Sequence, residues 1–150
     1  MQPTNLADHP EGGRFKEVFR SNSKVTATDG RSRNALTHIY FSLRPGEVSR
    51  FHKVASDEVW NLYRGEGVHL HIWKGSGKPP ETITLSAGSN TFCHVIPAGA
   101  WQAAEPISGE VLVGCSVAPG FEFEDFEMIE PGSENAGMLA GISSKWEKFM

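Results

Sequence analysis

The sequence predicts an all-β protein, an antiparallel sandwich or barrel. Short stretches rich in β-branched and aromatic residues recur along the chain, separated by Gly, Pro, Asn and Ser. The separating segments, such as Arg44–Gly46 and Gly75–Pro80, carry residues that favour chain reversal. The expected strands are Arg14–Arg20, Leu36–Leu43, Glu47–His52, Glu58–Tyr63, Val68–Trp73, Glu81–Leu85, Thr91–Ile96, Val111–Val117 and Phe121–Ile129.

Alternation within these strands predicts which side chains share a face. In Val68–Trp73 the apolar residues point one way, so His69 and His71 share the opposite face. A solvated or interface surface is favoured there over a chelating pair of histidines. By the same rule, Phe121–Ile129 is expected to be a final strand whose glutamates form a solvated acidic side.

Helix is expected only near the C-terminus. In Ser143–Met150, Trp146 and Phe149 are three residues apart and would pack one helical face onto the barrel. A frayed tail is the alternative for this end. The whole chain, residues 1–150, is expected to form one domain with one core.

Composition excludes several classes of function. The hydrophobic content of 39% and charged content of 21% are those of a globular chain. No apolar run approaches the roughly 20 residues that span a bilayer, and a signal peptide is not recognisable, so we expect a cytoplasmic protein without a membrane partner. A net charge of −4 and the lack of a basic stripe argue against nucleic acid as a partner. Cys93 and Cys115 lie in strand-like stretches and are expected to be buried free thiols, with a disulfide as the alternative.

Two spaced motifs suggest a metal-binding β-barrel with part of its ligand set missing. In the first, running from Gly46 to Gly65, His52 and Glu58 are present but Val54 occupies a usual ligand position. The second is Pro97-x-Gly99-x2-Gln102, with glutamine where such a motif supplies another histidine.

These motifs resemble those of the cupin superfamily, and several blocks resemble its small cupin_5-like family. The resemblance implies a double-stranded β-helix (jelly-roll) barrel over residues 9–127, followed by a C-terminal extension over residues 128–150. The blocks are His9–Gly13, which in isolation is only a turn, Ile39–Phe41, Ser49–His52, Ser56–Trp60 and Val113–Phe121.

The resemblance implies a metal site made of three histidines and a glutamate, and this chain matches only two of these ligands, His52 and Glu58. Because catalytic metal sites usually keep three protein ligands, we predict no cofactor. A divalent metal ion held by His52 and Glu58 is the alternative, if His38, His71 or His94 supplies a further ligand.

The remaining polar groups suit proton transfer. By alternation His52 shares a face with Arg50, and Glu58 shares one with Trp60. We expect His52 to act as a base, Glu58 to fix its tautomer and Tyr40 to return the proton. Arg50 would then hold an anionic group of the substrate. Trp60, Trp101, Gln102 and His71 are the other expected substrate contacts.

Each of these residues also has a structural explanation. His52 and Glu58 can be a satisfied polar pair, Arg50 a salt-bridge partner, Tyr40 a wall residue and Gln102 a cap on its turn. Three functional hypotheses therefore stay open: a metal-independent isomerase-like or epimerase-like enzyme, a non-catalytic module that binds a metabolite, and a metal-dependent cupin with an altered ligand set. Because jelly-roll sheets leave edges to cover, a homodimer formed through Arg14–Arg20 is expected.

Overall fold

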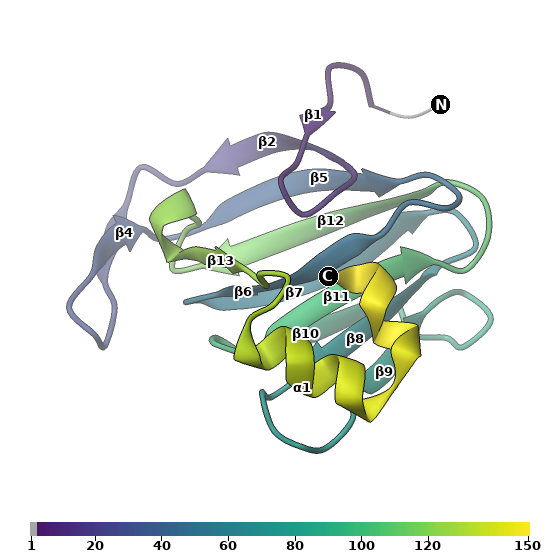
Figure 1. Ribbon diagram of the computed structural model, residues 1–150. Helices are drawn as coiled ribbons and strands as arrows, with labels where there is room; N and C mark the ends of the chain where they lie inside the picture. Colours follow the sequence, from purple (N-terminus) through teal and green to yellow (C-terminus); the bar gives the residue numbers. More distant parts are fainter. Residues whose placement is uncertain (1–2) are drawn as a thin grey trace.

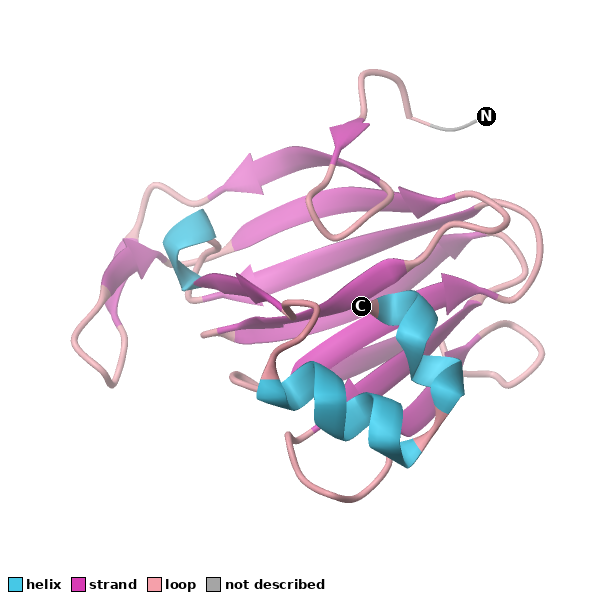
Figure 2. Cartoon of the chain, in the orientation of Figure 1, coloured by secondary structure: helices cyan, strands magenta, loops and turns pink. Residues whose placement is uncertain are grey.

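The structure, a computed structural model, describes residues 3–150 and contains two antiparallel sheets that face each other (Figures 1 and 2). The six-stranded sheet contains, in spatial order, β1 (Ala7–Asp8), β2 (Arg14–Arg20), β5 (Thr37–Leu43), β12 (Val111–Ala118), β7 (Asp57–Arg64) and β10 (Cys93–Ile96). The five-stranded sheet contains β13 (Phe126–Met128), β6 (Ser49–Val54), β11 (Trp101–Pro106), β8 (Val68–Trp73) and β9 (Glu81–Leu85). A separate hairpin of β3 (Lys24–Thr26) and β4 (Ser32–Asn34) projects at the left of Figure 1.

The predicted all-β fold is confirmed, and β2, β8 and β9 have the predicted bounds. The prediction missed β11, whose small and polar residues Gln102–Glu105 lack the β-branched side chains that mark a strand. It also extended the last strand too far towards the N-terminus. A 3₁₀ helix, η1 (Phe123–Asp125), comes first, and pairing with β6 begins only at Phe126.

The core between the sheets follows from alternation along the strands. In β8, Val68, Leu70 and Ile72 point inwards. From the opposite sheet, Val113 and Cys115 of β12 meet them. This apolar cluster joins the two sheets, and burial of its side chains is the main stabilisation of the sandwich.

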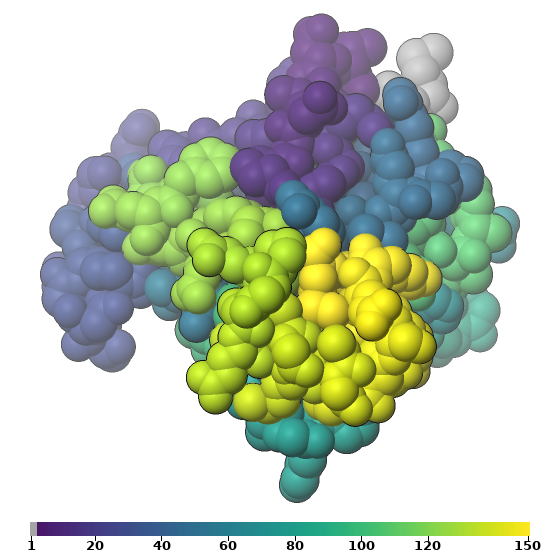
Figure 3. Space-filling model, in the orientation of Figure 1, coloured from purple at the N-terminus to yellow at the C-terminus, as the bar shows by residue number. Residues whose placement is uncertain are grey.

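A second core lies on the outer face of the five-stranded sheet. The helices α1 (Glu134–Ile142) and η2 (Ser144–Phe149) cover that face, and in Figure 3 the end of the chain, drawn in green to yellow, forms the near surface over it. Trp146 and Phe149 are buried there, as the sequence predicted, but their segment is a 3₁₀ helix preceded by an unpredicted α-helix. Small residues such as Gly137 and Gly141 weaken the apolar pattern of α1.

Two smaller findings bear on the sequence predictions. Among the described residues 3–150, no helix has the length and apolar character needed to cross a membrane. Both cysteines are free thiols; Cys115 is buried as expected, whereas Cys93 is exposed on the edge strand β10.

Candidate functional site

A cavity of about 280 Å³ lies between the two sheets. Its walls are largely aromatic, formed by Phe15, Phe41, Trp60, Phe121, Phe123 and Phe126. Among these rings lie the titratable side chains of His9, Glu11, His52 and Glu58, and the lining also includes Glu17, Arg20, Cys115 and Glu122. A mostly apolar pocket with a few placed polar groups is the usual form of a small-molecule site.

His52 and Glu11 form the polar centre of the cavity. The Nδ1–H of His52 donates to the backbone oxygen of Arg50 at 2.8 Å, which leaves the Nε2 atom without a proton in the neutral ring. That Nε2 lies 3.1 Å from Oε2 of Glu11. The hydroxyl of Ser49 donates to the other Glu11 oxygen at 2.8 Å. The carboxyl of Glu11 is therefore held in one orientation against the imidazole.

Glu58 enters the same cavity from β7 and is supported by two polar neighbours. The indole N–H of Trp60 donates to Oε1 of Gln102 at 2.8 Å, which orients the amide of Gln102. Burial raises the pKa of the Glu58 carboxyl, and the nearby His52, Trp60 and Gln102 oppose the change without cancelling it. Gln102 is 2% exposed and Glu58 6%, so these contacts are shielded from water.

Burial brings both carboxyl groups into the range where they titrate near neutral pH. It raises the pKa of Glu11 to about 7, against the attraction of His9, and the pKa of Glu58 to about 7, against the attraction of His52. Burial also lowers the pKa of His52, with Glu58 opposing the change. The proton shared by Glu11 and His52 therefore lies on Glu11 when the pair is neutral.

The turn between β1 and β2 places Glu11, a residue that the sequence reasoning did not identify. The backbone N–H of Arg50 donates to the Glu11 carbonyl at 2.8 Å and fixes the turn to β6. At Gly12 the chain has a φ of +109°, and a Cβ atom there would lie 2.2 Å from the Val48 carbonyl oxygen. Only glycine fits this approach. Strand periodicity gives no direction for a side chain in such a turn, and the signals in the sequence were the glycine pair and the resemblance of His9–Gly13 to the family.

Replacing Glu11 with glutamine is expected to change how stability depends on pH. A carboxyl whose pKa is about 7 when folded and 4.5 in its usual environment keeps its proton longer in the folded chain. Its contribution to stability is therefore full below about pH 4.5 and is lost as pH rises to about 7. As pH rises from about 4.5 to about 7, the free energy of unfolding of Glu11→Gln should therefore increase relative to that of wild type by about 1–3 kcal/mol. Urea unfolding at several pH values measures this difference.

The neutral histidines act with the opposite sign. Burial lowers the pKa values of His9 and His52, so their contribution is present above about pH 6.5 and is lost as pH falls below the unfolded value. Both proteins keep these histidines, so the difference between wild type and Glu11→Gln reports the carboxyl together with its effect on the pKa of His9, which Glu11 raises against the larger effect of burial. An unchanged difference across the range would contradict the raised pKa of Glu11.

The predicted position of Arg50 is wrong. The register between β6 and β11 shifts, so that Gln102 is opposite His52 but Ala104 is opposite Ser49. This bulge interrupts the alternation, and Ser49 rather than Arg50 points inwards with His52. The guanidinium of Arg50 instead donates to the backbone oxygen of Pro10 at 2.5 Å, and Arg50 does not line the cavity.

The prediction that Tyr40 faces His52 across the cavity is also wrong. Its neighbours Ile39 and Phe41 in β5 line the cavity, so Tyr40 points to the other side of the six-stranded sheet. There it lines a surface hollow with His38 and Tyr63. The alternation of β5 already favours this direction, because Ile39, Phe41 and Leu43 share one face while Tyr40 shares the other with His38 and Ser42.

The remaining predicted contacts are divided between the cavity and the second core. Trp60 lines the cavity, and Gln102 lies beside Glu58 just behind its wall. Trp101 is buried in the second core and not at the cavity mouth. His71 lies on that outer face too, with its ring 5.0 Å from those of Trp146 and Phe149.

The donor set does not fit a bound metal ion. The motif positions place Val54 beside His52 and Glu58 in the cavity, and its hydrocarbon side chain offers no ligand. His38 and His71 lie on outer faces of the two sheets, so neither completes a set with His52. In the described part of the chain, no group of three or more His, Cys, Asp or Glu side chains is arranged to hold a metal ion.

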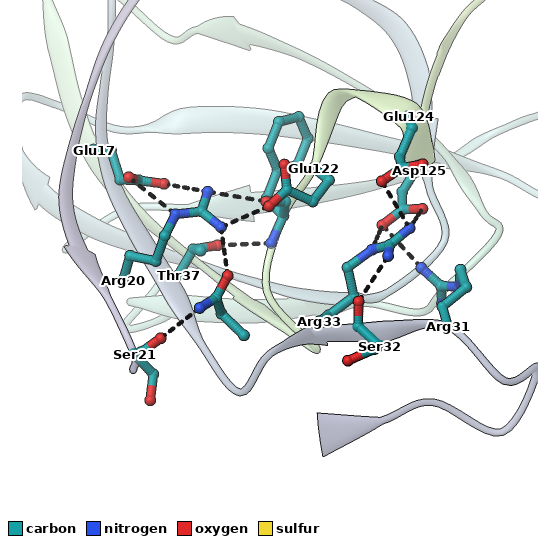
Figure 4. A network of polar contacts seen from close by, with 12 residues as sticks. Glu17, Arg20, Ser21, Arg31, Ser32, Arg33, Thr37, Glu122, Glu124 and Asp125 are labelled. Atoms are coloured by element: carbon teal, nitrogen blue, oxygen red, sulfur yellow. Dashed lines mark hydrogen bonds and ion pairs between the residues drawn. The ribbon is translucent and has the colours of Figure 1, made fainter. Parts of the chain in front are cut away.

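Three of the aromatic wall residues belong to one short segment, Phe121–Phe126, which we call the aromatic flap. Arginines hold it from two sides (Figure 4). Arg20 of β2 donates to Glu122 at 2.9 Å and to the Phe121 carbonyl at 3.0 Å. Arg31 and Arg33 of the β3–β4 hairpin contact Asp125 at 2.9 and 2.8 Å. These charge-assisted contacts fix the flap over the cavity.

Replacing Asp125 with asparagine is expected to loosen the aromatic flap. The change removes the charge that both hairpin arginines contact, and such contacts contribute about 1–2 kcal/mol. Amide hydrogen exchange in Phe121–Phe126, followed by mass spectrometry, should accelerate about 5- to 30-fold. The control is Glu124→Gln, because the Glu124 side chain is 70% exposed and its contact with Arg33 is screened. Equal exchange in wild type and Asp125→Asn would contradict this role.

Comparison with known proteins places these features in a family. The sequence family described as "Cupin superfamily (DUF985)", Cupin_5, matches residues 1–129. A solved structure from Shewanella oneidensis has 30% identity and a TM-score of 0.79, covering 96% of this chain and 90% of that one. A hypothetical protein from Leishmania major has 28% identity and a TM-score of 0.76, covering 95% and 89%. Oxalate decarboxylase from Bacillus subtilis, at 15% identity and a TM-score of 0.60 over 84% of this chain and 30% of its own, shares the fold alone. Comparison with curated protein sequences found no match.

Proposed function

The chain belongs to the cupin superfamily (DUF985), and from that fold and its cavity we propose a small-molecule enzyme that transfers protons next to a carbonyl group without a metal ion, as an isomerase or epimerase. One observation carries the proposal. Two buried carboxyl groups, Glu11 and Glu58, and the imidazole of His52 enter one apolar cavity. Groups that titrate near neutral pH in such a site are suited to general acid and base catalysis.

Each group has a distinct role in the proposed reaction. Glu58, in its ionised form, takes the proton from the carbon next to the carbonyl. The protonated Glu11–His52 pair donates its proton to the carbonyl oxygen, which becomes the hydroxyl of an enol. In epimerisation a proton returns to the other face of the same carbon, and the enol hydroxyl gives its proton back to the Glu11–His52 pair as the carbonyl re-forms. In isomerisation of an α-hydroxy carbonyl compound, the proton returns to the former carbonyl carbon, and the other hydroxyl of the enediol gives its proton to the pair. The Arg50 carbonyl accepts the Nδ1–H of His52, so Nε2 is the ring atom that exchanges the proton with Glu11.

Solvent exchange tests the proposal before the substrate is known. The protein is incubated in D₂O with a panel of small aldehydes, hydroxyketones, aminoketones and keto acids, and proton NMR follows the signal of the hydrogen next to the carbonyl. We expect the wild-type protein to replace this hydrogen with deuterium in at least one compound, and we expect His52→Gln to slow the exchange. A compound that binds in the cavity without any exchange would indicate the non-catalytic binding module instead.

We also expect a homodimer formed through β2. The short β1 pairs with Phe15 and Arg14, and among the described residues 3–150 no strand lies beside the outer edge of β2 beyond them. Val18 and Phe19 on this stretch are 42% and 52% exposed. Light scattering after size-exclusion chromatography should give about twice the 16.4 kDa of one chain, and Phe19→Asp should give the monomer. A monomeric wild type at micromolar concentration would refute the dimer.

A further inference from the structure

The charged side chains of the cavity leave no cation for an anionic ligand. Arg20 is the only lysine or arginine among the lining residues, and it is bound to Glu17 at 2.7 Å and to Glu122 at 2.9 Å. Its charge is therefore already offset by two carboxylates. A carboxylate or phosphate group entering the cavity would meet Glu11 and Glu58 without a counter-charge, which is an unfavourable burial of like charges.

We propose that the ligand of this cavity is a small primary amine, bound as its ammonium ion with an apolar or aromatic body. This inference rests on the proposed function, because it names the substrate class of the same site. The ammonium group would pair with the carboxylate of Glu58, and the aromatic walls would contact the rest of the molecule. Aromatic faces also attract a cation directly.

The size of the cavity fits such a molecule. An engineered cavity of about 150 Å³ in another protein binds benzene. The volume of about 280 Å³ found here has room for one ring with a short amine-bearing chain. The aromatic flap, with Phe121, Phe123 and Phe126, would close over the ring.

Among the titratable groups around the cavity, the carboxyls of Glu11 and Glu58 are the ones that change charge near neutral pH. Burial lowers the pKa values of His9 and His52 and raises the pKa of the Cys115 thiol, so all three are neutral there. The other charged groups near the site are Arg50, which attracts Glu11 but does not line the cavity, and Glu17, Arg20 and Glu122, which line it beside the flap. Binding of an ammonium ion then requires one carboxyl to lose its proton.

Three probes of similar shape test the proposal by isothermal titration calorimetry: benzylamine, benzyl alcohol and benzoate. Benzylamine should bind more tightly than benzyl alcohol, and benzoate should not bind. Between about pH 6 and about pH 8 the affinity for benzylamine should rise about tenfold, because one carboxyl with a pKa near 7 must ionise. The affinity for benzyl alcohol should stay constant over the same range.

Variants locate the binding site. Glu58→Gln should weaken benzylamine binding by about tenfold or more, because a charged hydrogen-bond partner is removed. The control is Glu66→Gln, at an exposed position in the loop between β7 and β8, which should bind like wild type. Benzoate binding, an affinity for benzylamine that does not change with pH, or no binding of any probe would each overturn the inference.

The outcomes also separate this inference from the proposed function. Solvent exchange on an anionic carbonyl compound, without benzylamine binding, would keep the proton-transfer function and overturn the amine ligand. Benzylamine binding with the predicted pH dependence, without exchange on any compound of the panel, would support the amine ligand and contradict the enzyme.

Discussion

Replacing Glu58 with glutamine is expected to lower kcat by about 100- to 10,000-fold on any compound whose proton the wild type exchanges, the usual contribution of a positioned base. The amide has nearly the same shape as the carboxyl but cannot accept a proton. Because Gln102 and Trp60 can still pack against it, the variant should fold. Circular dichroism and the unfolding midpoint check that the fold is unchanged.

The pH profile of wild type distinguishes catalysis by this pair from a merely structural role. Glu58 must be ionised and the Glu11–His52 pair protonated, so kcat/KM should fall on both sides of an optimum near neutral pH. Because the groups interact, the two limbs report the site as a whole and not single residues. The Glu58→Gln variant should lose the acidic limb of the profile.

Tyr40→Phe is the matched control for this experiment. It removes a hydroxyl group from the outer face of the six-stranded sheet, away from the cavity. Turnover should therefore be the same as in wild type. Loss of activity in Tyr40→Phe, with retained activity in Glu58→Gln, would place the active site on the outer face of the six-stranded sheet and contradict the proposed mechanism.

Replacing Trp146 with alanine is expected to lower the free energy of unfolding by about 3–5 kcal/mol, the usual cost of removing a buried tryptophan. Trp146 is 2% exposed. Its ring contacts those of Phe51, His71 and Phe149, with centroids 6.1, 5.0 and 6.1 Å away. Its loss leaves a cavity between η2 and the outer face of the five-stranded sheet. Urea unfolding followed by circular dichroism measures the change.

The neighbouring Glu147→Ala provides the control for the Trp146 variant. Glu147 is exposed in the same 3₁₀ helix, so its replacement should change stability by no more than about 0.5 kcal/mol. A loss below about 1 kcal/mol in Trp146→Ala would mean that the C-terminal segment is not part of the folded core.

Much of the fold could be predicted because its signals are local. In Val68–Trp73 a single alternation of apolar and polar residues gave both the strand and its inward face. The cupin resemblance was confirmed by the family match over residues 1–129. The α-helix at Glu134–Ile142 was missed because its glycines and alanines give little apolar periodicity. Contact with the sheet, through Leu139 and Ala136, stabilises it instead.

The candidate site was predicted in part. His52 and Glu58 lie in strands whose alternation directs both towards the cavity, and both are there. Arg50 was misplaced because a bulge in β6 interrupts that alternation, and a bulge depends on pairing with β11, a strand far along the sequence. Tyr40 was misplaced because it was chosen for its phenol group, although alternation in β5 places it on the face opposite Ile39 and Phe41.

By itself the sequence determined most of the sheet strands, the jelly-roll family and the two polar residues His52 and Glu58, because alternation and motif spacing are properties of neighbouring residues. Only the tertiary structure decided that Glu11 belongs beside them. Its turn is held by contacts with β6, some 40 residues further along the chain, which no local pattern can encode. The tertiary structure also decided the net charge of the cavity. That charge depends on which charged side chains the folded sheets direct inwards and on which of them are neutralised by an ion pair.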